Sequence, residues 1–350
     1  MTMPSFVSTP HSFTRLELGS HLDHERLEAL TKAVEEWPAG APPPALLIDL
    51  TRLDKVDFSL RPRLVDVHIA LKAKAGRSVY LAFKPVLRGL ALWILHLAGD
   101  QKGSVAGTER QARAWLASTE GRVASFFDAL GKPRLTLRAD DGPLPPLSMR
   151  ERAVSRIGGF FTRISQGYWL AFLEELIRTF GVEGLQQIGE QNEEILAALG
   201  ERWDAETAQL VVGMGALWNG CSYCGAGHIY AANLLHFQRT GDLLPFDERD
   251  VPRLQQWTDS AILEELLARF SGPLDAVGAL VRRQFDLKIN GAEPEDDADA
   301  LLLRACAAWD IVNECSIVID LDEVPPLNPA MAKNRALQRR YRKRREAAAT

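Results

Sequence analysis

The sequence has few cysteines and no long apolar run. Only four cysteines occur in 350 residues, which excludes a disulfide-rich secreted scaffold. The longest uncharged apolar run, residues 89–99, is shorter than the roughly 20 residues that a membrane-spanning helix needs. The first residues lack the basic and then apolar pattern of a signal peptide. We therefore expect a cytoplasmic protein without a membrane partner, whose cysteines serve redox, catalytic or metal chemistry.

Charge is distributed unevenly along the chain. The net charge is −5, yet residues 333–345 carry eight basic side chains and no acidic one, which leaves −13 for the rest. An acidic body does not favour nucleic-acid binding, and a basic run alone is a weak signal for it. We expect the tail, residues 333–350, to be frayed or docked on a partner or on acidic surface of the chain itself.

Residues 1–137 alternate between strand and helix patterns. Strands are predicted at 13–18, 45–50, 79–83 and 104–106, and helices after Asp23, after Ser59, at 85–99 and from Thr108. Ser59 is predicted to cap its helix rather than to be a phosphorylation site. This order favours a small α/β domain suited to protein contact.

The same stretch resembles the STAS domain of sulfate transporters and anti-sigma-factor antagonists. The resemblance covers roughly residues 12–118 and is carried by Arg15-Leu-Glu-Leu-Gly, by the strand 46–50 and by the turn Asp57-Phe-Ser-Leu. In that family the turn has a phosphorylatable hydroxyl in second place, followed two residues later by glycine. Here Phe58 and Leu60 occupy those places, so the resemblance implies a binding module without the regulatory phosphorylation.

A Pro- and Gly-rich linker, residues 138–150, separates this domain from a helical half, residues 151–332. The second half lacks strand alternation, so we expect an α+β chain of two domains, the second all-α. Its apolar periodicity predicts helices near 152–164, 167–180, 183–199, 204–218, 220–239, 258–270, 273–285, 296–317 and 328–346.

Cys221, Cys224 and His228 form the most informative motif. Their spacing places two thiols and an imidazole on one face of a helix that begins just after Asn219-Gly220. A helix N-terminus stabilises a thiolate, so the pattern predicts a redox-active pair. Two small buried apolar side chains are the plain alternative. A zinc site is a second alternative. It would need a fourth ligand from Cys306 or Cys315, and both of these are most simply explained as core residues.

Residues 209–236 resemble the AhpD-like alkylhydroperoxidase and carboxymuconolactone decarboxylase family, through Asn219-Gly-Cys-Ser-Tyr-Cys-Gly-Ala-Gly-His228. The resemblance implies that Cys224 attacks a hydroperoxide, that Cys221 resolves the sulfenic acid, and that His228 relays protons. The family's relay glutamate falls at Gln209, which cannot carry a proton, and Glu206 one turn earlier is a possible substitute.

Two functions follow as expectations. The first is a thiol-dependent peroxidase that acts on a hydroperoxide or disulfide, takes electrons from an external thiol reductant and needs no cofactor or metal. The second is a redox-responsive interaction protein, whose STAS-like half binds a regulatory partner according to the thiol state. Lactone decarboxylation is disfavoured, because it has no need of a dithiol. Proteins of the AhpD type commonly assemble, so we also expect a homo-oligomer.

Overall fold

The computed structural model of the chain describes residues 4–8, 13–38, 44–122, 142, 144–317 and 324–348. The chain divides into two compact units. The first unit consists of Met1–Ser125 and Ala139–Leu144, and the second consists of Phe126–Arg138 and Pro145–Thr350. The first is a small α/β unit and the second is helical, which confirms the predicted α+β class with two domains. Within the predicted linker, residues 138–141 and 143 lie outside the described residues.

The first unit is built on a five-stranded sheet with the order β1-β2-β4-β6-β7. Its strands are β1 (Ser5–Ser8), β2 (Phe13–Glu17), β4 (Ala45–Asp49), β6 (Arg77–Leu81) and β7 (Gly103–Ala106). Only β1 is antiparallel to its neighbour; the other pairs are parallel. A second, two-stranded sheet pairs β3 (His21–Leu22) with β5 (Lys55–Val56).

Helices cover both faces of the large sheet. The helices are α1 (His24–Glu36), α2 (Arg61–Lys72), α3 (Pro85–Leu97) and α4 (Glu109–Ala117). Side chains of α1, α2 and α3 pack with Leu16, Ile48 and Tyr80 of the sheet. The opposite face, with Leu47 and Val79, packs against α4. Both faces of the central strands are buried, as the continuous apolar run at 45–50 predicted.

The cap predicted at Ser59 is wrong. A 3₁₀ turn, Phe58–Leu60, precedes α2, and the Asp57 carboxylate accepts the Ser59 amide N–H at 2.9 Å. Leu60 is the N-cap of α2 and makes no side-chain hydrogen bond there. Strands β1, β3 and β5 were not predicted, and β3 and β5 have only two residues each, too few to show alternation.

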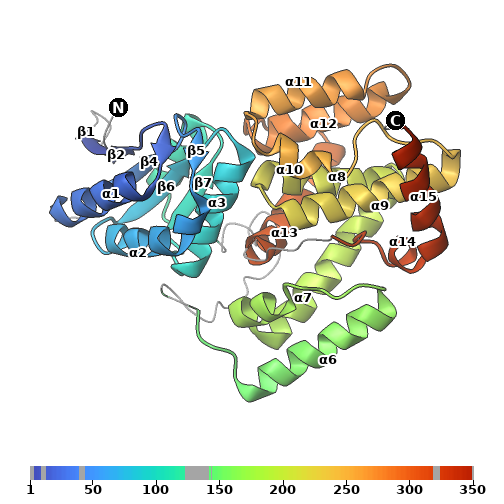
Figure 1. The fold of residues 1–350 in the computed structure, drawn as a ribbon, viewed down its shortest axis with the longest axis horizontal. Helices are drawn as coiled ribbons and strands as arrows, with labels where there is room; N and C mark the ends of the chain where they lie inside the picture. The colour runs from blue at the N-terminus through green and yellow to red at the C-terminus, as the bar shows by residue number, and fades with distance from the viewer. Residues whose placement is uncertain are drawn as a thin grey trace. The chain divides into compact units, whose positions relative to one another are not determined.

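The second unit is helical (Figure 1). Its described α-helices are α6 (Met149–Ser165), α7 (Leu173–Arg202), α8 (Ala205–Asn219), α9 (Ser222–Thr240), α10 (Asp250–Leu254), α11 (Asp259–Arg269), α12 (Asp275–Lys288), α13 (Asp297–Ser316), α14 (Pro329–Lys333) and α15 (Arg335–Ala348). α8 and α9 form a hairpin, and most of the residues of both helices are buried. Trp218 of α8 is fully buried and meets Phe285 of α12 edge-on, with 5.0 Å between ring centroids.

Most of the predicted helices are present, but the helix predicted at 328–346 is divided at Asn334 into α14 and α15. Three further differences occur. The helix predicted from residue 167 begins at Leu173, because Gly167 has a φ of 85° and turns the chain. The predicted break at Gly181 is a non-helical residue inside α7. The short α10 was not predicted; its Pro252 lies in the first turn, where proline is tolerated. Among the described residues, no helix has the length and apolarity needed to cross a bilayer.

The basic tail is folded onto its own unit as far as it is described. Tyr341 of α15 is fully buried and packs with Tyr230 and Phe237 of α9. The acid that meets the tail is Glu248, which pairs with Arg345 and accepts the Tyr341 hydroxyl at 3.1 Å. Of the three expectations for the tail, docking on acidic surface of the chain itself is the one that the structure shows.

Candidate functional site

The turn between α8 and α9 places both motif cysteines. Gly220 ends α8 with a φ of 76°, a left-handed conformation that glycine adopts without strain. The Cys221 amide then donates to the Ala216 carbonyl at 3.0 Å. Cys221 is the N-cap of α9, and Cys224 lies in its first turn. The predicted helix N-terminus at the cysteines is therefore confirmed.

The Cys221 sulfur lies where a thiolate is stabilised. Burial disfavours its ionisation, since the side chain is fully buried. Hydrogen bonds from the Cys224 thiol, the Ser316 hydroxyl and the backbone amides of Cys224 and Tyr223 outweigh that effect and lower the pKa of Cys221. The amides are the N–H groups that a helix N-terminus leaves without partners inside the helix.

The Cys224 thiol is shifted in the opposite direction. Burial raises its pKa well above the ordinary range, and the hydrogen bond and negative charge of Cys221 raise it further. Cys315 adds a smaller effect of the same sign. When the pair loses one proton, these shifts favour the charge on Cys221 and the remaining proton on Cys224. The residues therefore favour Cys221 as the resting thiolate, whereas the family resemblance assigns the attack to Cys224.

Ser316 joins the two sulfurs from the end of α13. Its Oγ lies 3.0 Å from Cys221 Sγ and 3.1 Å from Cys224 Sγ. The Asn313 carbonyl lies 3.1 Å from the same oxygen and competes with the sulfurs for its single hydrogen, and Ser316 is fully buried. A hydroxyl accepts from a thiol and donates to a thiolate, so it serves both states of the pair. Sequence reasoning missed Ser316, and no motif marks it.

His228 is held as a neutral ring. Its Nδ1 lies 2.7 Å from Gln209 Oε1, and its Nε2 lies 3.2 Å from the indole N–H of Trp309. An indole only donates, so Nε2 is unprotonated and Nδ1 donates its hydrogen to Gln209. Burial lowers the pKa of His228 to about 3. The structure joins His228 to Gln209, as the motif spacing implied, and both ring nitrogens are engaged.

Glu206 belongs to a different cluster. Its carboxylate is paired with His236 Nδ1 at 2.8 Å and with Arg239 Nη2 at 2.8 Å. Glu206 and His236 are both buried. From the sequence, Glu206 was a possible replacement acid beside His228. The structure places Glu206 beside the other histidine of α9.

Two aromatic side chains lie near the thiols on the side of the α6–α7 loop. Burial and then the charge of Cys224 raise the pKa of Tyr168 to about 12. The same two causes raise the pKa of Tyr223, which packs edge-on against Phe172 with 5.8 Å between centroids. Tyr168, Tyr223 and Phe172 thus give the thiols an aromatic neighbourhood on this side.

The remaining cysteines do not complete a metal site in the part of the chain that the structure describes. There, no three His, Cys, Asp or Glu side chains converge with the geometry of a metal centre. Cys306 accepts from Gln284 Nε2 at 3.6 Å, and Cys315 Sγ lies 3.8 Å from Thr179 Oγ1. All four cysteines are buried, and none of them is joined in a disulfide in this structure.

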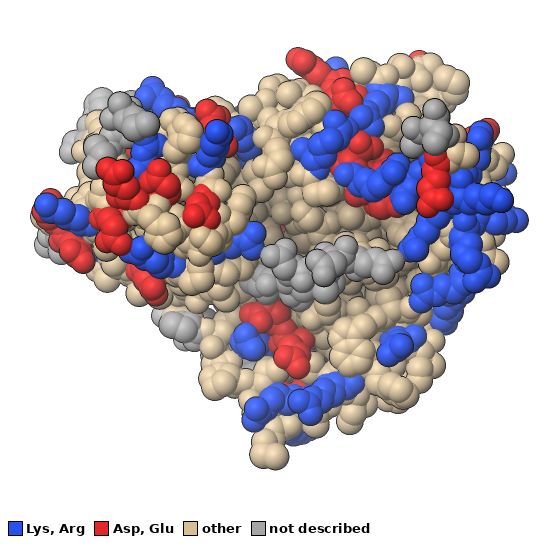
Figure 2. All heavy atoms as spheres, in the orientation of Figure 1, with Lys and Arg blue, Asp and Glu red and all other residues tan. Residues whose placement is uncertain are grey.

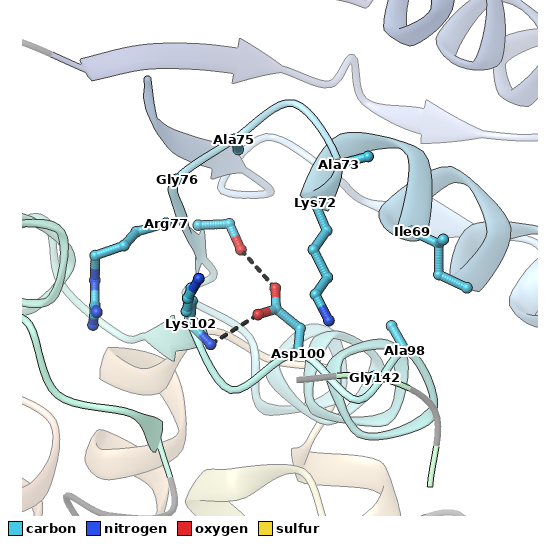
Figure 3. A pocket seen from close by; sticks show the side chains of 11 residues that line it. Ile69, Lys72, Ala73, Ala75, Gly76, Arg77, Ala98, Asp100, Lys102 and Gly142 are labelled. Atoms are coloured by element: carbon cyan, nitrogen blue, oxygen red, sulfur yellow. Dashed lines mark hydrogen bonds between the residues drawn. The ribbon is translucent and has the colours of Figure 1, made fainter. Parts of the chain in front are cut away.

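The first unit has a hollow of about 390 Å³ at the amino-terminal ends of β6 and β7 (Figure 3). Asp100 accepts the Lys102 amide at 2.8 Å and the His68 Nε2 hydrogen at 2.9 Å. His68 Nδ1 in turn lies 2.8 Å from the Tyr80 hydroxyl. Despite burial, the hydrogen bond and charge of His68 lower the pKa of Asp100 to about 2. Parallel α/β sheets bind ligands at the opposite, carboxyl edge, so we interpret this network as structural.

Comparisons with family models, with curated proteins and with solved structures find no match for this chain. The two family resemblances therefore remain predictions that depend on the motif residues.

Proposed function

We propose that the chain is a thiol-dependent peroxidase or related oxidoreductase of the AhpD-like type, cycling through a Cys221–Cys224 disulfide. The observation that carries the proposal is the convergence of both sulfurs on the Ser316 hydroxyl at the N-terminus of α9, with pKa values shifted in opposite directions. A helix N-terminus, a charged thiolate and a protonated neighbour are the elements that dithiol chemistry requires.

The reaction proceeds in two displacements. A thiolate of the pair attacks the distal oxygen of the hydroperoxide, an S–O bond forms, the O–O bond breaks, and the alkoxide takes a proton and leaves as an alcohol. The second thiol then gives up its proton and attacks the sulfenic sulfur, so that an S–S bond forms and water leaves. One hydroperoxide and two thiols become one alcohol, one water and one disulfide. An external dithiol reductant restores the pair.

The surroundings of His228 predict slow turnover. A proton relay needs a group that loses and gains a proton near pH 7. The neutral ring, held between Gln209 and Trp309, has no protonated form to offer at that pH. Glutamine at the relay position supports the same conclusion, because it cannot exchange a proton.

The decisive experiment measures thiols and mass together. Addition of one equivalent of cumene hydroperoxide should remove two thiols and 2 Da, with the disulfide mapped to Cys221 and Cys224. A dithiol reductant should restore both. The Cys221→Ser and Cys224→Ser variants should not form that disulfide, and Cys306→Ser should behave as the wild type. Unchanged peroxide consumption in both active-pair variants contradicts the proposal.

A second function is favoured by the burial of the dithiol. Both sulfurs are almost completely inaccessible, which suits a slow redox response better than rapid turnover. In this alternative the STAS-like first unit binds a regulatory partner according to the thiol state. It predicts partner capture that differs between the reduced and oxidised proteins, with negligible turnover. Equal capture in both states contradicts it.

Assembly into a homo-oligomer is part of the proposal. α6 exposes a stripe of apolar side chains, namely Met149, Ile157, Phe160, Phe161 and Ile164. Solvent-exposed apolar patches of this kind favour burial against another molecule. Light scattering should show an assembly that dissociates in the Phe160→Ser, Phe161→Ser double variant. A monomeric wild-type protein would contradict the proposed homo-oligomer and leave the proposed dithiol chemistry unaffected.

A further inference from the structure

A cavity of about 470 Å³ lies in the helical unit. Its wall is contributed by α6, by the loop before α7, by α9, by residues 324–326 and by α15. The volume lies in the range of small-molecule sites. The side chains that give it a chemical character are Arg163, Tyr168, Trp169, Tyr230, Arg335 and Arg342.

The polar groups of the cavity are predominantly cationic. Arg163 comes from α6, whereas Arg335 and Arg342 come from α15, and no carboxylate occurs among the described residues that line it. Figure 2 shows Lys and Arg side chains gathered over α15. Burial raises the pKa of Tyr230, and the neighbouring guanidinium of Arg342 opposes that rise. Guanidinium groups on two separate helices match the oxygens of a carboxylate or phosphate.

The aromatic part of the wall is fixed by the α6 backbone. Trp169 is 46% exposed, and its indole lies against Gly159 of α6. A Cβ at Gly159 would come within 2.4 Å of the Trp169 ring, so only glycine permits this contact. An exposed indole held in this way offers a rigid apolar face to a ligand at low entropic cost.

The cavity is connected to the redox motif by two observations. Tyr168 lines the cavity and is also close enough to Cys224 for the charge of that thiol to affect its hydroxyl. Pro325 lines the cavity as well, and the next segment is bonded to the motif, since the Leu327 amide donates to the Gly227 carbonyl at 2.9 Å. A Cβ at Gly227 would meet Leu327 at 2.5 Å. Gly227, which lies between Cys224 and His228, therefore allows the segment that forms this part of the cavity wall to approach α9.

We infer that this cavity binds the anionic group of the substrate, a carboxylate or phosphate attached to an apolar body, and presents that body to the dithiol past Tyr168. The inference rests on the proposed function for the identity of the reacting group, an organic hydroperoxide or disulfide. It also gives the basic tail a role, because α15 supplies two of the three arginines while Tyr341 holds the helix in place.

Binding is tested without turnover. Sodium decanoate and decyl phosphate, both without an oxidising group, are titrated calorimetrically below their micellar concentrations. We expect saturable binding at one site, weakened about tenfold or more in the Arg335→Gln, Arg342→Gln double variant, as loss of charge-assisted hydrogen bonds predicts. The matched control is Arg339→Gln, Arg344→Gln, which removes the same charge from exposed residues of α15 that do not line the cavity. The two ligands distinguish a carboxylate from a phosphate preference.

Absence of saturable binding, or an equal loss in both double variants, overturns the inference. The Cys221→Ser, Cys224→Ser variant should bind both ligands as the wild type does. If the wild type binds decanoate but consumes no hydroperoxide, the proposed function fails and the anion site stands. If it consumes cumene hydroperoxide but binds neither anion, the site fails and the proposed function stands.

Discussion

The hydroxyl of Ser316 lies 3.0 Å from the sulfur of Cys221, although 95 residues separate the two in the chain. Ser316 ends α13, and Cys221 begins α9. The contact thus joins the last turn of one buried helix to the first turn of another. It provides the dithiol with its one side-chain hydroxyl partner among the described hydrogen bonds, and it predicts a measurable effect on thiol reactivity.

Replacing Ser316 by alanine should slow alkylation of Cys221 by iodoacetamide at pH 7. The variant loses a donor to the thiolate, so the pKa of Cys221 rises and the thiolate fraction falls. One such bond corresponds to a change of up to about tenfold in rate at a pH below that pKa. The control is Ser222→Ala, whose hydroxyl donates to Gln255 rather than to a sulfur. Equal alkylation rates in wild type and Ser316→Ala contradict the assignment.

The order of the two cysteines can be decided from single variants. Cys224→Ser leaves Cys221 with the N-terminal amides of α9, so its thiol should react at lower pH than an ordinary cysteine. Cys221→Ser leaves Cys224, whose pKa burial raises. The alkylation rates of both variants, measured between pH 5 and 10, give the apparent pKa values of Cys221 and Cys224. A lower apparent pKa for Cys224 would reverse the assignment and favour the order that the family resemblance implies.

Restoring an acid at residue 209 should accelerate peroxide reduction. Gln209→Glu places a carboxylate within 2.7 Å of His228 Nδ1, which favours the imidazolium and supplies a group that exchanges protons. General acid–base catalysis contributes about 10²–10⁴ in rate, so we expect kcat/KM for cumene hydroperoxide to rise about tenfold or more. Gln209→Met, similar in size and without a proton to exchange, is the control. A folded Gln209→Glu protein no faster than wild type contradicts the relay interpretation.

The sequence was sufficient to predict those features of the fold that depend on neighbouring residues in the chain. The cysteine spacing and Gly220 were sufficient to place the thiols at the start of α9, because capping depends on a few adjacent residues. Alternating periodicity was sufficient for the main strands and helices of the first unit. Ser316 and Trp309 could not be predicted, because α13 approaches the motif only through packing of helices far apart in sequence.

The error over Glu206 has the same origin. Residues 206 and 209 lie on the same face of an isolated α8. From the sequence, an acid at either position was therefore expected to reach His228. The pairing of α8 with α9 then determines which histidine each side chain meets, and Glu206 meets His236. The sequence also left open where the basic tail lies, because the acid that binds it, Glu248, is in a loop far from the tail in the sequence.

His228 should make the helical unit sensitive to acid. Its pKa is about 3 in the folded protein, against an ordinary value near 6.5, so below pH 6.5 the unfolded chain binds a proton that the folded chain refuses. The free energy of unfolding therefore falls as the pH decreases from 6.5 towards 3, by up to about 1.4 kcal/mol per pH unit from this group. Urea unfolding at pH 7 and pH 5 should show a smaller loss in His228→Asn than in wild type. The His228 Hε1 resonance should not titrate between pH 5 and 8, and a midpoint near pH 6.5 would show that the ring is not held neutral by burial.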